Sequence, residues 1–213
     1  MNPKFNDKEY WSKYYDKLLA IGKPTEPSPF AKYLIENNII KPYQLAIELG
    51  CGNGRDAIFF SKNNIKVIAI DQCKNTTTIL NQLENIESFP ADFTELPPLD
   101  KEINVVYSRF TMHSIAEVEE NNTLKWVFDN LENKGLICIE VRTTKDPLCG
   151  KGIDKGNNGW FYNNHHRRFV SANNFRNKLL QIGFKISLFE ENNGFAPHKD
   201  EDPIVLRVIA SKK

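Results

Sequence analysis

Four adjacent basic side chains, His165, His166, Arg167 and Arg168, stand in the segment NNHHRRF of a chain whose formal net charge is only +1. Guanidinium groups bind phosphate or carboxylate through paired hydrogen bonds, and an imidazole exchanges a proton near neutral pH. The segment is therefore a candidate for anion binding and proton transfer. The alternative is a solvated surface turn, as most basic runs are. Neighbouring side chains of an extended chain also point to opposite faces, so all four are not expected to act on one ligand.

A second candidate is the Gly-rich stretch AIELGCGNGRD, where Glu48 ends an apolar run and three glycines follow at alternate positions, Gly50, Gly52 and Gly54. Glycines let the backbone approach a ligand and adopt conformations that a Cβ excludes. A helix placed after the loop directs free N–H groups toward such a ligand. The dinucleotide fingerprint G-x-G-x-x-G/A is not met, because Arg55 stands at its last position.

The elements that must position these residues alternate between strand and helix. Short apolar runs bounded by turn residues predict strands, and longer runs with helical spacing predict helices. Strands are expected at 44–49, 66–71, 87–92, 103–108, 135–141, 184–190 and 203–211, and helices at 29–37, 55–64, 75–85, within 116–133 and at 171–182. This order predicts an α/β fold, with a mostly parallel sheet, helices on both faces and an antiparallel last strand.

The pattern E-L-G-C-G-N-G resembles motif I of the class I S-adenosylmethionine-dependent methyltransferases. Asp71 ends the second strand, where the family's acid binds both ribose hydroxyls, and Asp92 follows the third strand, where the family's acid meets the adenine amino group. Each acid taken alone is also explained as a cap or turn residue. The resemblance covers residues 45–141 and implies a Rossmann-like seven-stranded fold, with S-adenosylmethionine as cofactor and S-adenosylhomocysteine as product. The cofactor-binding residues that it implies are Glu48, Gly50, Cys51, Gly52, Asn53, Gly54, Asp71, Gln72, Asp92 and Phe93.

The segment after the fourth strand, YSRFTMH, bears on the acceptor. It lacks the N/D/S-P-P-Y/F tetrad of amino-methylating DNA enzymes, and the chain has no Pro-Cys pair of the kind that carbon-5 enzymes need. Metal-dependent catechol-type enzymes need acids where this chain has Arg109 and Arg142, so no metal is expected. The balance of 28 Lys and Arg against 27 Asp and Glu also argues against a nucleic-acid partner.

Two subgroup resemblances remain open. LGCGNGR is similar to the tellurite-resistance methyltransferases, whereas YSRFTMHSI, EVRTTKDPLCGKG, HHRRF and DPIVLRVIA look like methyltransferases of bacterial capsule and lipopolysaccharide gene clusters, over residues 105–208. The second likeness implies O-methylation of a small or glycan-end acceptor in surface polysaccharide biosynthesis. Within it only His165 carries over, since a tyrosine often stands where His166 does. Acceptors that are amines, thiols or oxyanions, or a non-catalytic cofactor-binding module, are the alternatives.

Residues that follow parallel strands gather at one edge of a sheet, so the acceptor is expected there. Catalytic roles are expected for His113, His165 and Arg109, and substrate binding for Arg142, His165, Arg167, Arg168 and Tyr14. An anionic acceptor with phosphate or carboxylate suits the arginines. One of Arg167 and Arg168 is expected to be structural, paired with an acid such as Asp146 or Asp202. Arg207, inside an apolar strand, is expected to form a structural ion pair.

The 213 residues fit one domain. We expect a helical cap over 1–40, a cofactor-binding core over 45–141, an acceptor-side insertion over 142–170, and a last helix with a strand pair over 171–213. The polar, Gly-rich insertion is too long for a simple connector. An aromatic helix at 8–19 either packs on the sheet or closes over the site as a lid.

The segment MNPKFNDKEYW has no apolar h-region, and no apolar run approaches the length of about 18 residues that a membrane span needs. The four cysteines, Cys51, Cys73, Cys138 and Cys149, have wide and irregular spacings without a CxxC pair. We therefore expect reduced thiols in a cytoplasm, without a zinc site. The oligomeric state stays open.

Overall fold

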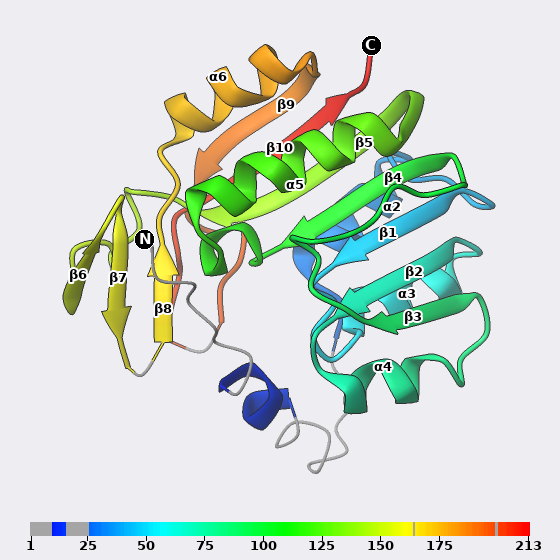
Figure 1. Ribbon diagram of the computed structural model, residues 1–213, viewed down its shortest axis with the longest axis horizontal. Helices are drawn as coiled ribbons and strands as arrows, with labels where there is room; N and C mark the ends of the chain where they lie inside the picture. The colour runs from blue at the N-terminus through cyan, green and yellow to red at the C-terminus, as the bar shows by residue number, and fades with distance from the viewer. Residues whose placement is uncertain (1–9, 16–25, 164, 199) are drawn as a thin grey trace.

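The computed structural model describes residues 10–15, 26–163, 165–198 and 200–213. The strands of its main sheet are β1 (Leu45–Leu49), β2 (Lys66–Asp71), β3 (Ile86–Pro90), β4 (Ile103–Arg109), β5 (Leu131–Arg142), β9 (Lys185–Asn192) and β10 (Val205–Ser211). They lie in the order β3-β2-β1-β4-β5-β10-β9 (Figure 1). Strands β1 to β5 pair in parallel, whereas β10 is antiparallel to both β5 and β9. The fold class expected from the sequence is confirmed.

Helices cover both faces of this sheet. They are α2 (Pro29–Glu36), α3 (Arg55–Lys62), α4 (Lys74–Leu80), α5 (Glu117–Asn130) and α6 (Ala172–Ile182), with a short 3-10 turn η1 (Met112–Ser114) after β4. Helices α5 and α6 pack on one face, and α2, α3 and α4 on the other, so that each face has its own apolar core (Figure 1). Short apolar strands with buried side chains on both faces are what such a two-sided sheet requires.

The start of α2 is determined by its first residues. Ser28 is the N-cap, and its hydroxyl oxygen accepts a hydrogen bond from the N–H of Ala31 at 3.0 Å, while Pro29 stands at the first helical position. Ser28 also donates its own N–H to Asp56 at 2.7 Å, and Tyr107 donates its hydroxyl to the same carboxylate at 2.8 Å. This buried network fixes α2 against the start of α3, beside the Gly-rich loop.

The structure shortens one predicted helix. Helix α4 ends at Leu80, although the sequence pattern predicted a helix over 75–85. The side chain of Asn81 accepts the N–H of Ser88 at 2.6 Å and donates to the Ser88 carbonyl at 2.8 Å. These two bonds replace the next helical turn and lead the chain into β3.

The predicted long loop after β5 is largely a second sheet. It contains three antiparallel strands, β6 (Ile153–Gly156), β7 (Gly159–Tyr162) and β8 (His165–Arg168). Asn157 and Asn158, with φ of 49° and 57°, turn the chain between β6 and β7. A two-residue turn with positive φ at both positions suits asparagine and matches the twist of a hairpin. The GNNG sequence was therefore an available hairpin signal that the length argument overlooked.

The ends of the chain add few elements. Residues 10–15 are helical, in agreement with part of the helix predicted over 8–19, while the remainder of that helix lies outside the described residues. Within the described ranges, no helix combines the length and the apolar character that a bilayer crossing requires. The four cysteines are free thiols.

Candidate functional site

The carboxyl ends of the parallel strands open into a cavity of about 1050 Å³. Parallel α/β sheets bind their ligands at this edge. One half of the cavity is built by the Gly-rich loop and the residues that follow β2 and β3. The other half is built by the residues after β4 and β5, by β8, by the 10–15 helix and by the chain before β10.

The Gly-rich loop turns sharply between β1 and α3. The N–H groups of Gly50 and Cys51 both donate to the carbonyl of Ile70, at 2.8 and 3.0 Å. Gly52 and Gly54 have φ of +56° and +75°, in the left-handed region that favours glycine. Gly54 is the N-cap of α3, and a Cβ there would press on the buried Leu80 side chain.

All but two of the predicted cofactor-binding residues line the cavity; the lining ones are Glu48, Gly50, Cys51, Asn53, Asp71, Gln72, Asp92 and Phe93. Gly52 and Gly54 do not line it. Gly52 lies beneath the ring of Tyr15, and Gly54 faces Leu80. These two glycines therefore shape the loop, because their lack of a Cβ makes room for neighbouring side chains.

Asp71 connects the loop to the end of β2. Its Oδ2 accepts the N–H of Gly52 at 2.8 Å and its Oδ1 accepts the N–H of Cys73 at 2.9 Å. Burial raises the pKa of Asp71, and these backbone N–H groups oppose that rise. A carboxylate has about four acceptor sites, so both oxygens retain capacity for ligand hydroxyls. Asp92, after β3, uses Oδ1 for the N–H and hydroxyl of Thr94.

Glu48 is a buried acid with an unsatisfied oxygen. Among the described residues, its Oε2 has no hydrogen-bond partner, although the side chain lines the cavity. Burial, with the nearby charge of Asp56 next in importance, raises the pKa of Glu48 well above its usual range. A buried acceptor without a partner is costly, and a cationic ligand group beside it would restore the charged form. The carboxylate oxygens of this half, which accept hydrogen bonds and are negative when ionised, therefore fit the cationic cofactor that the motif implies.

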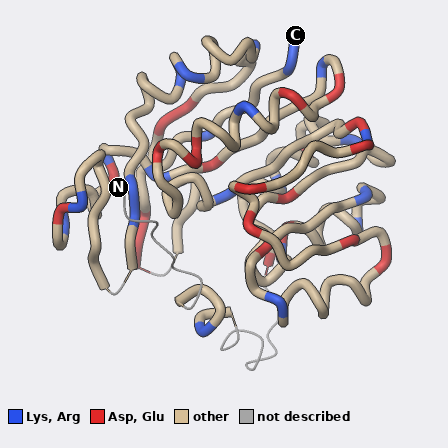
Figure 2. The backbone as a smooth tube through the Cα atoms, in the orientation of Figure 1, with Lys and Arg blue, Asp and Glu red and all other residues tan. Residues whose placement is uncertain are grey.

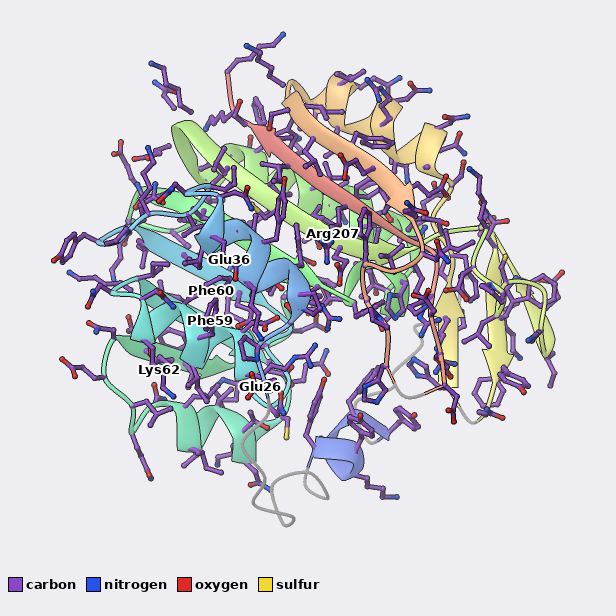
Figure 3. All side chains as sticks on the ribbon, turned by 180° about the vertical axis from the view of Figure 1, so that it is seen from behind. Glu26, Glu36, Phe59, Phe60, Lys62 and Arg207 are labelled. Carbon is purple, nitrogen blue, oxygen red and sulfur yellow. The ribbon has the colours of Figure 1, made fainter. Side chains whose placement is uncertain are left out.

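The acceptor half begins with a buried ion-pair triad. Glu140 on β5 accepts from the Nε of Arg109 on β4 and from the Nε of Arg207 on β10, both at 2.7 Å. Arg207, labelled in Figure 3, projects from β10. Its guanidinium lies 4.4 Å from the ring centroid of Phe195 and donates to the Phe195 carbonyl at 2.8 Å. The ion pair predicted for Arg207 is confirmed. Arg109 lines the cavity, and its positive charge is paired with the Glu140 carboxylate.

Arg142, at the end of β5, lies between two carboxylates. Its Nη1 donates to Asp146 at 2.9 Å and its Nη2 to Glu201 at 3.0 Å. The guanidinium groups of Arg142 and Arg109 both lie over the ring of Phe110, at 5.6 and 4.4 Å from its centroid. Phe110 has a φ of 56°, which is rare for an aromatic residue and common at functional sites. Arg142 is thus held at the cavity wall, and Asp146 pairs with it rather than with the basic quartet.

The basic quartet divides by the alternation of a strand. His165 and Arg167 line the cavity, whereas His166 and Arg168 are buried on the other side of β8. Among the described residues, no carboxylate lies within ion-pair distance of Arg167. Its Nη1 donates a hydrogen bond to the carbonyl of Tyr162 at 3.4 Å.

The substrate-binding role expected for Arg168 is wrong. Arg168 forms a buried ion pair with Glu120 of α5 and donates to the carbonyls of Ile115 and Met112 at 3.0 and 3.1 Å. One of the two arginines is therefore structural, as expected, but its acid is Glu120 rather than Asp146 or Asp202. This contact fastens β8 to the segment after β4.

His113 lines the cavity from η1 and is 3% exposed. Its Nδ1 has no hydrogen-bond partner among the described residues. Burial is the main cause that lowers the pKa of His113 well below its usual range, with the positive charge of Arg142 next. The imidazole is therefore neutral near pH 7 and able to accept a proton.

The 10–15 helix covers the cavity. Tyr10, Trp11, Tyr14 and Tyr15 line it, and the ring of His165 stacks on Tyr10 at 4.8 Å and meets Trp11 edge-on at 4.9 Å. Of the two interpretations of this aromatic segment, the contacts favour a cover over the site, because its rings meet β8 and the Gly-rich loop.

Sequence reasoning missed the chain before β10. Residues that line the cavity from this segment are Ala196, Pro197, His198, Asp200, Glu201 and Pro203. Because β10 is antiparallel to β5, with Val205 opposite Arg142, the chain that enters β10 must pass the same sheet edge. The expected antiparallel last strand was thus a usable signal for this part of the site.

Charges of both signs are interspersed along the chain (Figure 2). No group of three or more His, Cys, Asp or Glu side chains in the described ranges is arranged to hold a metal ion. The electrostatics of the site are therefore local, set by the acids of the first half and the arginines of the second.

A family model described as a methyltransferase domain matches residues 9–187 of this chain. The chain is similar to the ribosomal RNA small subunit methyltransferase G of Magnetococcus marinus, at 27% identity over 161 residues, which is 68% of this chain and 66% of that protein, just under two thirds. An uncharacterized methyltransferase of Staphylococcus carnosus is 20% identical over 151 residues, covering 68% of this chain and 72% of its own length.

Solved structures share the fold. The 1,6-didemethyltoxoflavin-N1-methyltransferase of Burkholderia thailandensis, with bound 1,6-didemethyltoxoflavin and S-adenosylhomocysteine, superposes with a TM-score of 0.72 at 16% identity, over 96% of this chain and 86% of that one. An S-adenosylmethionine-dependent methyltransferase from Methanosarcina mazei has a TM-score of 0.72 at 13% identity, over 84% of this chain and 96% of that one. The likeness to capsule and lipopolysaccharide enzymes and the exclusion of nucleic acid stay predictions.

Proposed function

This chain belongs to the methyltransferase domain family, and on that premise we propose that it transfers a methyl group from S-adenosylmethionine to an oxygen of a small, anionic acceptor. The observation that carries the proposal is Arg167, which lines the cavity with no carboxylate at ion-pair distance among the described residues. A partly buried cation of this kind needs an anionic partner. The anionic group of the acceptor supplies it.

The first half of the cavity suits the cofactor. Glu48 offers an unsatisfied buried oxygen to the amine of the cofactor, Asp71 accepts from the ribose hydroxyls and Asp92 from the adenine amino group. When bound, S-adenosylmethionine supplies a methyl group on a positively charged sulfur. The acids of this half stabilise that positive charge, because a buried site screens charges less than water does.

Alignment of the acceptor with the methyl group is the main contribution of the second half. Holding two reactants in position can supply about 7–11 kcal/mol of the barrier in good cases. Arg167 binds the anionic group, and the aromatic helix at residues 10–15 excludes water. We propose that the 142–170 segment, which contains β8, is the acceptor-side insertion of a single domain.

His113 is the proposed general base for a hydroxyl acceptor. It accepts the hydroxyl proton at Nδ1 as the acceptor oxygen bonds to the methyl carbon. Bound S-adenosylmethionine would supply that methyl group, and the electron pair of the broken carbon–sulfur bond would remain on sulfur. The lowered pKa of His113 keeps it in the neutral form that this step needs. His165, stacked on Tyr10, orients the acceptor and the lid rather than taking the proton. An acceptor carboxylate or phosphate oxygen would need no base.

We propose a glycan end or a free sugar derivative as the acceptor. The motifs after β4 and in the insertion, which look like those of capsule and lipopolysaccharide methyltransferases, support this choice, and the net charge of +1 supports a small acceptor over a nucleic acid.

The test is methyl transfer from labelled S-adenosylmethionine to matched acceptors. Glucose, glucose 6-phosphate and glucuronate are offered beside an amine, a thiol and small-subunit ribosomal RNA. Transfer to at least one of the two anionic sugars but not to glucose, lost in Arg167→Gln, is the expected result. Equal transfer to glucose and its anionic derivatives would show that Arg167 does not select the acceptor. Transfer to the amine or the RNA alone would show that the acceptor belongs to another chemical class.

A further inference from the structure

Arg142 is contacted by two carboxylates that differ in exposure. The side chain of Asp146 is 0% exposed and that of Glu201 is 60% exposed, while the Arg142 side chain between them is 12% exposed. Asp146 lies only four residues after Arg142, whereas Glu201 reaches it from the chain before β10. One arginine therefore has a buried partner and a partner in contact with solvent.

The buried partner is fixed in place. The Oδ1 of Asp146 accepts the N–H of Leu148 at 2.8 Å, and the N–H of Asp146 donates to the carbonyl of Thr143 at 3.0 Å. Asp146 is thus held by its own turn, and it holds Arg142 through Oδ2 at 2.9 Å. Removing such a carboxylate from a buried arginine is strongly unfavourable. Asp146 therefore positions Arg142 in every state of the site.

The exposed partner is displaceable. The Glu201 carboxylate meets Arg142 through one 3.0 Å bond, and its backbone is tied to His198 by two hydrogen bonds of 2.8 and 3.0 Å. Only the Glu201 side of this ion pair is exposed, and there water competes for the carboxylate and side-chain freedom is lost, which weakens the pair relative to a buried one. The Glu201 side chain can therefore leave Arg142 while its backbone stays in place.

Arg167 is close enough to Arg142 and its two carboxylates for their charges to interact, although neither carboxylate is at ion-pair distance from Arg167. Burial and the charge of Arg142 lower the pKa of Arg167, while the charges of Glu201 and Asp146 raise it, so the four groups share one neighbourhood. Two arginines and two carboxylates give no net charge. A singly charged anion in the place of Glu201 preserves that balance, whereas a doubly charged anion adds negative charge to a cavity that already contains the acids of the cofactor half.

We propose that Glu201 is a specificity-determining residue, because its carboxylate occupies the position at Arg142, beside Arg167, that the anionic group of the acceptor takes. An acceptor with a singly charged group, a carboxylate or a phosphodiester, displaces the Glu201 side chain. Neutral acceptors are rejected because they cannot replace the Glu201 carboxylate. This inference rests on the proposed anionic acceptor and adds its charge and the residue that selects it.

The test uses formate, with one negative charge, and sulfate, with two, as probes of the protein saturated with S-adenosylhomocysteine. Arginine side-chain signals in ¹⁵N-labelled protein report binding at constant ionic strength. Glu201→Gln is expected to bind formate about two- to fivefold more tightly than the unmodified protein, because the competing ion pair is gone. Formate is expected to bind more tightly than sulfate.

Glu191→Gln is the matched control, since Glu191 pairs with Lys145 at 2.6 Å and does not line the cavity. It removes the same charge and should leave formate affinity unchanged. Unchanged, weaker or undetectable formate binding in Glu201→Gln, an equal gain in Glu191→Gln, or a preference for sulfate would overturn the inference.

Arg167→Gln separates this inference from the proposed function. If Arg167→Gln leaves formate affinity unchanged, the anionic-acceptor proposal itself fails. If Arg167→Gln weakens formate binding but Glu201→Gln does not strengthen it, only the role of Glu201 fails. A loss in Arg167→Gln together with a gain in Glu201→Gln supports both.

Discussion

The phenol group of Tyr15 lies over Gly52, in the space that a side chain on residue 52 would need. Burial, with the charge of Asp71 next, raises the pKa of Tyr15, so the phenol is neutral and able to donate a hydrogen bond. Asp71 in turn accepts the N–H of Gly52 at 2.8 Å. The aromatic helix, the Gly-rich loop and the acid at the end of β2 are therefore in contact with one another.

Gly52→Ala is expected to displace the aromatic helix and to weaken S-adenosylhomocysteine binding by about tenfold or more, because the new methyl group collides with the Tyr15 ring and the φ of +56° is unfavourable for alanine. Calorimetric titration measures the affinity. Gly150→Ala is the control, since its φ of +89° carries a similar backbone cost and no atom lies within 4 Å of its Cβ position. Equal effects of the two variants would show that the collision is unimportant.

Asp71→Ala is expected to weaken S-adenosylhomocysteine binding at least about tenfold, because hydrogen bonds to a charged acceptor contribute about 1.5–3 kcal/mol each. Equilibrium dialysis with labelled ligand checks this. Asp154→Ala, which removes an exposed acid whose Oδ1 accepts the N–H of Gly156, should leave the affinity unchanged. An Asp71→Ala protein that is folded and binds normally would remove Asp71 from the site.

Glu48→Gln is expected to stabilise the ligand-free protein while it weakens cofactor binding. Burial raises the pKa of Glu48 in the folded state, so the native protein binds more protons than the unfolded one. The free energy of unfolding therefore falls as pH rises above the pKa that Glu48 has in the unfolded chain. The stabilisation should therefore grow from low to neutral pH, as thermal unfolding at several pH values measures.

Cofactor affinity should have the opposite dependence on Glu48. The amine of the bound cofactor favours the carboxylate, so binding releases a proton and the affinity of the unmodified protein rises with pH. Glu48→Gln should lose this rise. Calorimetry in buffers of different ionisation enthalpy detects the proton, and a pH-independent affinity in the unmodified protein would refute the assignment.

The neighbours Arg167 and Arg168 should respond differently to the same substitution. Arg168→Gln is expected to destabilise the fold by about 3 kcal/mol, because it leaves the buried Glu120 without its ion pair to β8. Arg167→Gln should leave stability nearly unchanged and reduce transfer to anionic acceptors. Urea unfolding together with the transfer assay measures both, and equal destabilisation by the two variants would contradict the division of β8 into two faces.

Local patterns predicted the elements that form the first half of the cavity, whereas the cofactor-binding roles of their residues stay proposals. The signals are short-range: apolar runs of the length of β1 and β2, turn residues, and the glycines after Glu48. Because parallel strands end at one edge of a sheet, Asp71 and Asp92 come to line the same cavity. The acceptor half was predicted by residue type, and Arg109, His113, Arg142 and Tyr14 do line the cavity. Their functional roles stay proposals.

Sequence alone determined the order of strands and helices in the main sheet, the Gly-rich loop and the acids at the strand ends, because each depends on neighbours within a few residues. Only the tertiary structure decided that Arg167 faces the cavity while Arg168 pairs with Glu120, and that Glu201 meets Arg142. An alternating strand offers two equivalent faces until another element covers one of them. The contact between Glu201 and Arg142 depends on the antiparallel pairing of β10 with β5. These strands are far apart in the sequence, so no short-range pattern predicts the contact.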